Sequence, residues 1–176
     1  MTTSTTGSYL SPMQEIIELG GTVSVSGLSR EQFFNLAARY PELLMEREKN
    51  GNITIMTPVK GGSGFRENTL SYHITHWNKT FEEGLVFSPS TGFNLPDSST
   101  KSPDVAWISS EQMQQLSPNS IEEEFISVVP DFISEIRSKT AKLVRLKEKK
   151  RQNGMENGVE MAWQIDPYKE KVHMYQ

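Results

Sequence analysis

Two carboxylates lie at or within apolar runs of this chain and are the first candidates for chemistry. Asp104 directly precedes the apolar run from Val105 to Ile108, and Glu135 lies inside the run from Phe132 to Ile136. Because the side chains of a strand alternate between its two faces, Glu135 shares a largely buried face with Ile133. An unpaired carboxylate there costs roughly several kcal/mol, so a divalent cation or a lysine is expected to compensate it.

The basic stretch after Glu135 offers a lysine. Leu143 and Leu146 mark the buried stripe of a predicted helix, and a further step of four residues reaches Lys150. Lys150 is therefore the lysine that shares the apolar stripe. A purely structural interpretation stays open, in which Lys150 extends past the sheet edge and Glu135 pairs with Arg137 or Lys150 only to serve the fold.

These residues belong to a predicted strand, helix and strand within Pro130–Asp166. We expect strands at Phe132–Ile136 and Val159–Ile165, and between them a helix at Lys139–Met155 that Asn157-Gly158 ends. Two strands joined in this way form a right-handed parallel crossover. The pattern predicts an α/β or α+β fold with a mixed sheet flanked by helices.

The N-terminal third predicts a helix and a hairpin. Ser29 and Gln32 have the spacing of a capping box, so we expect a helix at Arg30–Arg39. Two short β-rich runs, Leu43–Arg47 and Ile53–Met56, follow. The Asn-Gly pair between them favours a hairpin turn, because both residues tolerate positive φ.

The middle of the chain alternates turn-rich segments with short apolar runs. Gly61–Gly64 is expected to break the chain before a long amphipathic helix, which Gly84 ends in the left-handed conformation. The apolar stripe of this helix consists of Leu70, Ile74, Trp77 and Phe81. The other expected elements are strands at Leu85–Phe87, Gly92–Leu95, Val105–Ile108, Ile126–Val129 and, at an edge, Val172–Tyr175, and one loose helix at Glu111–Glu124.

Composition sets the broad class of the protein. A chain of 176 residues that is 35% hydrophobic is long enough for one compact domain, which we place at 15–176 after a flexible tail rich in serine and threonine at 1–14. A net charge of −4 and a pI of 5.5 argue against a protein that coats polyanions through bulk attraction. Any contact with nucleic acid is therefore expected to be local.

Two features that the sequence lacks, cysteine and a long apolar run, exclude further classes of protein. The chain contains no cysteine, which excludes disulfides and thiolate-bound metals. No apolar run approaches the ~18 residues of a membrane span, and the first residues lack a signal pattern. We therefore expect a cytoplasmic protein with no membrane partner.

Several short motifs follow one another in a fixed order. They are Thr57-Pro58, Ser90-Thr91-Gly92-Phe93, Leu95-Pro96-Asp97, Ser102-Pro103-Asp104-Val105-Ala106-Trp107, Pro130-Asp131-Phe132-Ile133-Ser134-Glu135-Ile136-Arg137-Ser138, Lys150 ahead of Asn157-Gly158-Val159, and Trp163-Gln164-Ile165-Asp166-Pro167. In this order they resemble the Uma-type endonuclease family, which is abundant in cyanobacteria and belongs to the restriction-endonuclease-like PD-(D/E)XK superfamily. The resemblance covers the chain from Ser29 to Tyr175.

The resemblance implies a restriction-endonuclease-like core and a phosphodiesterase site that depends on Mg²⁺, with Mn²⁺ as the alternative ion. Asp104 and Glu135 match the family's acidic residues and, with the Ile136 carbonyl, are implied to bind the metal. Arg137 stands where the superfamily has a lysine; it keeps its proton and is implied to clamp phosphate. Lys150 is implied to orient the attacking water or to stabilise the transition state.

One position departs from the family pattern. Relatives often have a glutamate in the glycine-rich turn before the long helix, where this chain has Gly62. Glu67 is either an auxiliary ligand or a solvated glutamate stabilised by the helix dipole, and the second interpretation is favoured. The loss at Gly62 supports an alternative function, a catalytically inactive binding or assembly module that keeps the nuclease fold.

The expected function is hydrolysis of phosphodiester bonds in DNA. Basic residues between Lys139 and Arg151 can contact a phosphate backbone, although a charged helix face is often just solvated. A homodimer would supply the two sites that cutting both strands requires. His73 and His76 have no evident third metal ligand. The tryptophans, Trp77, Trp107 and Trp163, are expected in the core.

Overall fold

The computed structural model describes residues 24–25, 27–56, 58–81, 83–139 and 154–176. The chain divides into two compact units, Met1–Pro58 and Val59–Gln176. The predicted tail at 1–14 and nearly all of the predicted helix at Lys139–Met155, including Lys150, lie outside the described residues. The other predicted site residues belong to the second unit.

The first unit contains a capped helix and a small antiparallel sheet. Helix α2 (Arg30–Arg39) begins at the predicted capping box, in which the Ser29 hydroxyl accepts the Gln32 backbone N–H and the Gln32 side chain accepts the Ser29 N–H. Strands β2 (Met45–Arg47) and β3 (Ile53–Ile55) form the predicted hairpin, and β1 (Ser24–Val25) pairs with β3.

Helix α3 (Gly61–Phe81) starts earlier than the sequence predicts. The expected break at Gly61–Gly64 is instead the first turn of the helix, where the Ser63 and Gly64 N–H groups donate to the Lys60 carbonyl at 2.8 and 3.1 Å. Glycine is unfavourable in a helix by about 1 kcal/mol relative to alanine. The helix tolerates this cost at its start because the long segment that follows propagates it.

Gly84 does not end α3 in the left-handed conformation, so that prediction is wrong. The helix stops at Phe81, and Gly84 opens strand β4 (Gly84–Phe87) with an ordinary negative-φ backbone. A Cβ atom at Gly84 would collide with the Ile108 carbonyl oxygen of the neighbouring strand. Glycine is required here because two strands approach closely.

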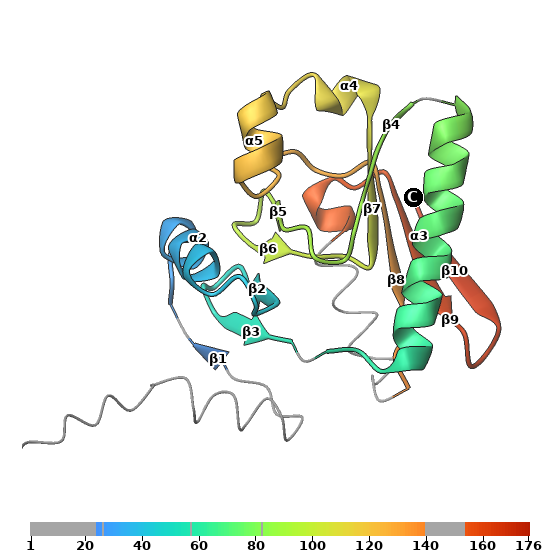
Figure 1. Cartoon of the computed structure of the whole chain (residues 1–176), viewed down its shortest axis with the longest axis horizontal. Coiled ribbons are helices and arrows are strands. Elements are labelled where there is room, and N and C mark those ends of the chain that lie inside the picture. Colours follow the sequence, from blue (N-terminus) through green and yellow to red (C-terminus); the bar gives the residue numbers. More distant parts are fainter. Residues whose placement is uncertain (1–23, 26, 57, 82, 140–153) are drawn as a thin grey trace, which may run out of the picture. The chain divides into compact units, whose positions relative to one another are not determined.

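The second unit is built on a mixed five-stranded sheet in the order β10-β9-β8-β7-β4 (Figure 1). Its remaining strands are β7 (Val105–Ser109), β8 (Phe132–Ile136), β9 (Met161–Asp166) and β10 (Lys171–Tyr175). Strands β8 and β9 are parallel, as the crossover predicts, and the other neighbours are antiparallel. The C-terminal ends of β8 and β9 therefore lie beside the N-terminal end of β7.

Short helices replace the single loose helix expected at Glu111–Glu124. Helix α4 (Ser110–Met113) and helix α5 (Pro118–Glu123) each begin at a serine cap, Ser109 and Ser117. Pro118 fits the first turn of α5 because its missing N–H would have no partner there. The second cap and this proline start a separate helix.

Ile126–Val129 is not a regular strand, contrary to expectation. Ile126 forms an isolated parallel bridge with Phe93 of strand β5 (Phe93–Asn94), which pairs with β6 (Thr100–Lys101). Ile126 and Val128 belong to the buried core, so burial explains the apolar pattern of this segment. After the undescribed region, the 3₁₀ helix η1 (Met155–Asn157) ends at Gly158, whose φ of +92° fits the predicted stop.

The two faces of the sheet have different partners. Ala106, Ile133 and Ala162 are paired neighbours on the face that joins the buried core. By alternation, the neighbouring residues of these strands lie on the opposite face. There Trp107 contacts Trp77 of α3, and the Trp107 indole N–H donates to Asn78 Oδ1 at 2.8 Å.

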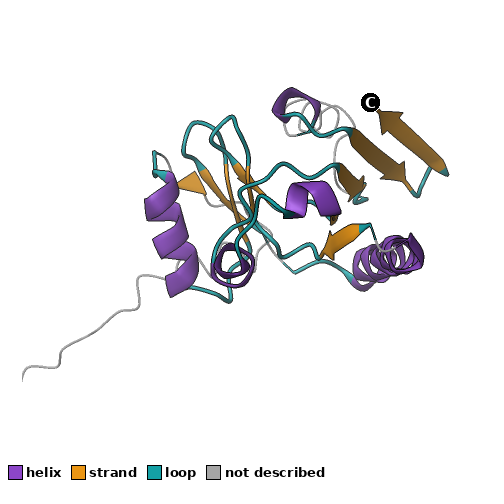
Figure 2. Cartoon of the chain, turned by 90° about the horizontal axis from the view of Figure 1, so that it is seen from above, coloured by secondary structure: helices purple, strands orange, loops and turns teal. Residues whose placement is uncertain are grey.

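Helix α3 runs along the β4, β7 and β8 part of the sheet, and Figure 2 shows it end-on beside the strands. Trp77 on this helix is 40% exposed, so the expectation that it belongs to the core is wrong. The mixed sheet and its helices confirm the predicted α/β class. None of the helices that the structure describes combines the length and hydropathy needed to cross a membrane.

Candidate active site

Asp104 and Glu135 meet at one end of the sheet. In the register of β7 and β8, Val105 pairs with Ser134, so one further step places Asp104 beside Glu135. Asp104 Oδ2 accepts a hydrogen bond from the Ile136 backbone N–H at 2.6 Å. This charge-assisted bond fixes the Asp104 carboxylate next to the backbone that carries Glu135.

Glu135 extends the core face of the sheet beyond Ile133. Its side chain is half-buried and lines a cavity of about 20 Å³ together with Ile133, Lys101 and Pro103. A cavity of this size holds about one water molecule. Glu135 and Lys101 are the charged residues of this cavity, whose other lining residues are apolar.

Lys101, on β6, is a buried cation that the sequence analysis missed. It is 4% exposed, and a lysine is rarely buried without a compensating carboxylate. Its charge also acts on Asp97: burial raises the pKa of Asp97, but hydrogen bonds from Ser99 and Asn157 and the charge of Lys101 outweigh burial and lower it. Lys101 directly precedes the Ser102-Pro103-Asp104 motif, and this position could have identified it. The turn-rich segment before Lys101 instead suggested a solvated loop.

Glu67 of α3 lies within electrostatic range of this site. Burial raises the pKa of Glu67, and the negative charge of Glu135 raises it further. The side chain is half-buried, which does not fit the favoured interpretation of a solvated glutamate. Gly62 is exposed, and its carbonyl accepts from the Arg66 guanidinium at 2.8 Å.

The donors at this end of the sheet suit a hard divalent cation that keeps several waters. Asp104 and Glu135 offer carboxylate oxygens, and the Ile136 carbonyl faces the same strand edge as the N–H that binds Asp104. Mg²⁺ is commonly held by one or two carboxylates plus water. Within the described ranges, no three His, Cys, Asp or Glu side chains are arranged to hold a metal ion. A metal here would therefore depend on two carboxylates, the main chain and water.

Arg137 is held by Asp166 at the C-terminal end of β9. The Arg137 guanidinium lies 2.9 Å from Asp166 Oδ2, and the Arg137 backbone N–H donates to the Ile165 carbonyl at 2.8 Å. Burial raises the pKa of Asp166, but hydrogen bonds from Arg137 and from the Tyr168 and Lys169 backbone lower it below its ordinary value. The ionised Asp166 thus fixes the position of Arg137.

Tyr168 has two guanidinium groups near its ring. The Cζ atoms of Arg66 and Arg137 lie 5.3 and 5.9 Å from the ring centroid, and Tyr168 is 42% exposed. An exposed aromatic ring beside arginines can stack a base while the arginines bind phosphate. Tyr168 and Arg66 were not among the residues predicted from the sequence, although Tyr168 directly follows the Asp166-Pro167 motif.

Gln164 pairs with Glu135 across the parallel strands. It is 3% exposed, and its Oε1 atom has no hydrogen-bond partner among the described residues. An unsatisfied buried amide costs about 1–3 kcal/mol, which is typical of positions that meet a ligand, an ion or water. Gln164 could have been identified from the sequence, because it is a polar residue inside a predicted apolar strand.

The structure brings together four of the five predicted site residues. Asp104, Glu135 and Ile136 meet at the ends of β7 and β8, and Arg137 follows at the end of β8. Lys150 lies outside the described residues, so its position relative to them stays a prediction.

Comparison with known proteins agrees with the resemblance in the sequence. The fold is similar to the crystal structure of a "putative nuclease" from Anabaena variabilis, with a TM-score of 0.63 and 19% identity over 85% of this chain and 80% of that chain. No curated protein matches the chain. Residues 30–176 match the model of the family Uma2, described as "Putative restriction endonuclease". Because this match spans most of the chain and contains every predicted site residue, the protein belongs to the Uma2 family.

Proposed function

We propose that this protein is a metal-dependent nuclease that hydrolyses phosphodiester bonds in DNA. The family description and the fold shared with the Anabaena protein support a nuclease-like function. The observation that carries the proposal is the hydrogen bond from Ile136 to Asp104, because it holds a second carboxylate beside Glu135. A homodimer would present one such site to each DNA strand.

Asp104, Glu135 and the Ile136 carbonyl would hold Mg²⁺ or Mn²⁺. When bound, the ion would lower the pKa of an attacking water and neutralise charge that develops on the phosphate. The Ile136 N–H orients the Asp104 carboxylate before any ligand arrives. Glu67 adds negative potential that favours a cation, since its charge already interacts with that of Glu135.

Two lysines divide the remaining roles in this proposal. Lys101 lines the same water-sized cavity as Glu135, so its ammonium offsets the buried negative charge. Lys150, the counterpart of the superfamily's lysine, orients the attacking water or stabilises the transition state. Arg137 cannot take this second role, because a guanidinium does not give up its proton.

Arg137, Arg66 and Tyr168 form the proposed substrate contact. A guanidinium carries five N–H donors, so a bond from Arg137 to Asp166 is compatible with a bond to a phosphate oxygen. The exposed Tyr168 ring would support a sugar or base next to that phosphate. The contact would be local, as the acidic net charge of the chain requires.

Nicking of supercoiled plasmid in Mg²⁺ or Mn²⁺ tests the proposal. Asp104→Asn and Glu135→Gln should each lower the rate on the order of a hundredfold, because each removes a charged ligand at nearly constant shape. Asparagine at position 104 still accepts the Ile136 N–H, so the fold should survive. Glu111→Gln changes an exposed carboxylate on α4 and should leave the rate unchanged.

A non-catalytic binding module with the same fold is the second candidate. It is favoured by Arg137, which replaces the superfamily's lysine and pairs with Asp166, and by Gly62 in place of a glutamate. Wild-type protein that retains DNA without nicking it, in either metal, would support the module and contradict the nuclease. Nicking that persists in both carboxylate variants would contradict the proposed site.

A further inference from the structure

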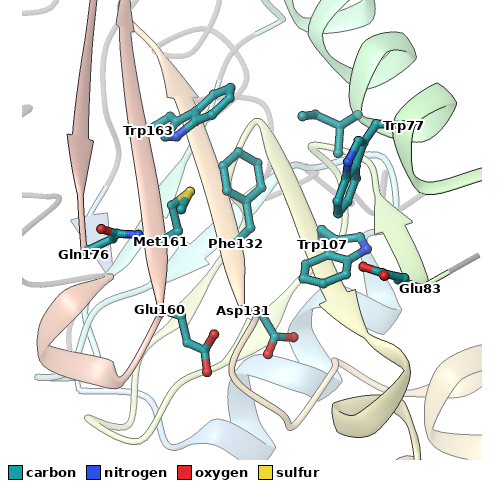
Figure 3. A pocket seen from close by; sticks show the side chains of 10 residues that line it. Trp77, Glu83, Trp107, Asp131, Phe132, Glu160, Met161, Trp163 and Gln176 are labelled. Atoms are coloured by element: carbon teal, nitrogen blue, oxygen red, sulfur yellow. The ribbon is translucent and has the colours of Figure 1, made fainter. Parts of the chain in front are cut away.

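A second cavity lies on the sheet face opposite Glu135. It has a volume of about 490 Å³, which is within the range of small-molecule sites. Trp77 of α3, Trp107 of β7, Phe132 of β8 and Trp163 of β9 contribute its aromatic walls (Figure 3). Nothing in the nuclease proposal uses this cavity.

The walls are two aromatic pairs. Trp77 and Trp107 have ring centroids 5.3 Å apart with planes at 70°, and Phe132 and Trp163 have centroids 5.2 Å apart with planes at 90°. The hydrogen bond from the Trp107 indole N–H to Asn78 fixes one of the rings. Figure 3 shows the Phe132 and Trp163 rings on one side of the opening and the Trp77 ring across from them.

Every charged residue that lines the cavity, among those the structure describes, is acidic. Figure 3 shows Asp131 and Glu160 at the lower end of the cavity and Glu83 beside Trp107. Asp131 is held in place because its Oδ2 atom accepts the Ser109 backbone N–H at 2.7 Å. The cavity therefore combines aromatic faces with one fixed carboxylate, Asp131, and two exposed ones, Glu83 and Glu160.

We propose that this cavity binds a small organic ammonium ion. Aromatic faces attract a cation through their quadrupole, most strongly when the cation is weakly hydrated, as an alkylated ammonium is. The three carboxylates of the lining add a direct charge attraction. An organic ion fits better than a metal, because no three acidic or histidine side chains within the described ranges are arranged as metal ligands. The proposal is independent of the nuclease site, which lies on the other face of the sheet.

Intrinsic fluorescence reports on this cavity directly, since all three tryptophans of the chain line it. Choline chloride should change the emission in a saturable way, and tetramethylammonium should do the same. The neutral carbon analogue of choline, dimethylbutanol, should bind several times more weakly. Equal binding of the two would overturn the proposal, because it would leave only an apolar pocket.

Two variants locate the interaction, and calorimetry gives a readout independent of tryptophan emission. Trp77→Leu, at a residue that is 40% exposed, should weaken choline binding about threefold to thirtyfold, the range of one cation–π contact. Glu160→Gln, at an exposed position, should weaken it about twofold to fivefold. Glu111→Gln, away from the cavity, should bind as wild type.

Absence of binding would also overturn the proposal. A lack of response up to about 20 mM choline is decisive. At that concentration, a binding free energy of only about 2 kcal/mol would fill half of the sites. Unchanged affinity in both Trp77→Leu and Glu160→Gln would place the binding elsewhere. Plasmid nicking by Glu160→Gln should equal that of the wild type, so failure here is distinguishable from failure of the nuclease proposal.

Discussion

At the residue scale, Glu135 is half-buried at the end of an apolar face, between a cationic and an anionic neighbour. Lys101 lines the same cavity, and Asp104 is fixed to the next backbone N–H. Asp104 and Glu135 were predictable because Asp104 opens an apolar run and Glu135 interrupts another. Lys101 was not, because residues that line its cavity, such as Pro130 and Val159, come from distant parts of the chain.

The pH dependence of stability tests the raised pKa of Glu67, to which burial contributes most and the charge of Glu135 contributes further. The pKa of Glu67 is raised in the folded protein above its ordinary value of 4.5, so the folded state keeps the proton to higher pH than the unfolded chain. Stability is therefore lost as pH rises through the window just above that value. Glu67→Gln should remove this loss and be more stable than the wild type near neutral pH, by about 0.5 kcal/mol for a partly screened pair.

Urea unfolding of both proteins across this pH range measures the difference. The two stability curves should converge in acid and separate as pH rises. Glu111→Gln serves as the control and should follow the wild type throughout. A difference between Glu67→Gln and the wild type that does not change with pH would contradict the raised pKa of Glu67.

At the scale of elements, long patterned segments were predicted more accurately than boundaries. Helix α2 and the parallel pair β8 and β9 agree with the sequence because a cap and a run of apolar residues specify them locally. The predictions for the start of α3 and for the role of Gly84 were wrong. Glycine serves several structural purposes, and tertiary neighbours decide which one applies. The predicted helix that carries Lys150 lies outside the described residues and stays a prediction.

Gly84 gives a test of how β4 joins the sheet. Gly84→Ala should lower the free energy of unfolding by about 2 kcal/mol or more, because its Cβ would collide with the Ile108 carbonyl and push β4 from β7. Gly64→Ala is the matched control: its Cβ would lie 3.6 Å from a Val59 methyl group, and stability should stay equal or rise by up to about 1 kcal/mol. Equal stability of the two variants in urea would contradict the close approach.

At the scale of the whole molecule, the family match extends from residue 30 to residue 176, across both compact units. The ordered motifs predicted this membership, and the strand, helix and strand pattern predicted the mixed sheet. They did not predict the division into two units, and the single domain at 15–176 stays a prediction. The aromatic cavity was missed because Trp77, Trp107 and Trp163 have the spacing of ordinary core residues.

Calorimetric titration with Mn²⁺ is the most direct test of the proposed nuclease site. The wild type should bind one ion at the Asp104 and Glu135 carboxylates, and Asp104→Asn and Glu135→Gln should each weaken that binding at least about tenfold. Glu111→Gln should bind as the wild type does. A wild type that takes up no Mn²⁺, or the same affinity in all four proteins, would contradict a metal site at the ends of β7 and β8.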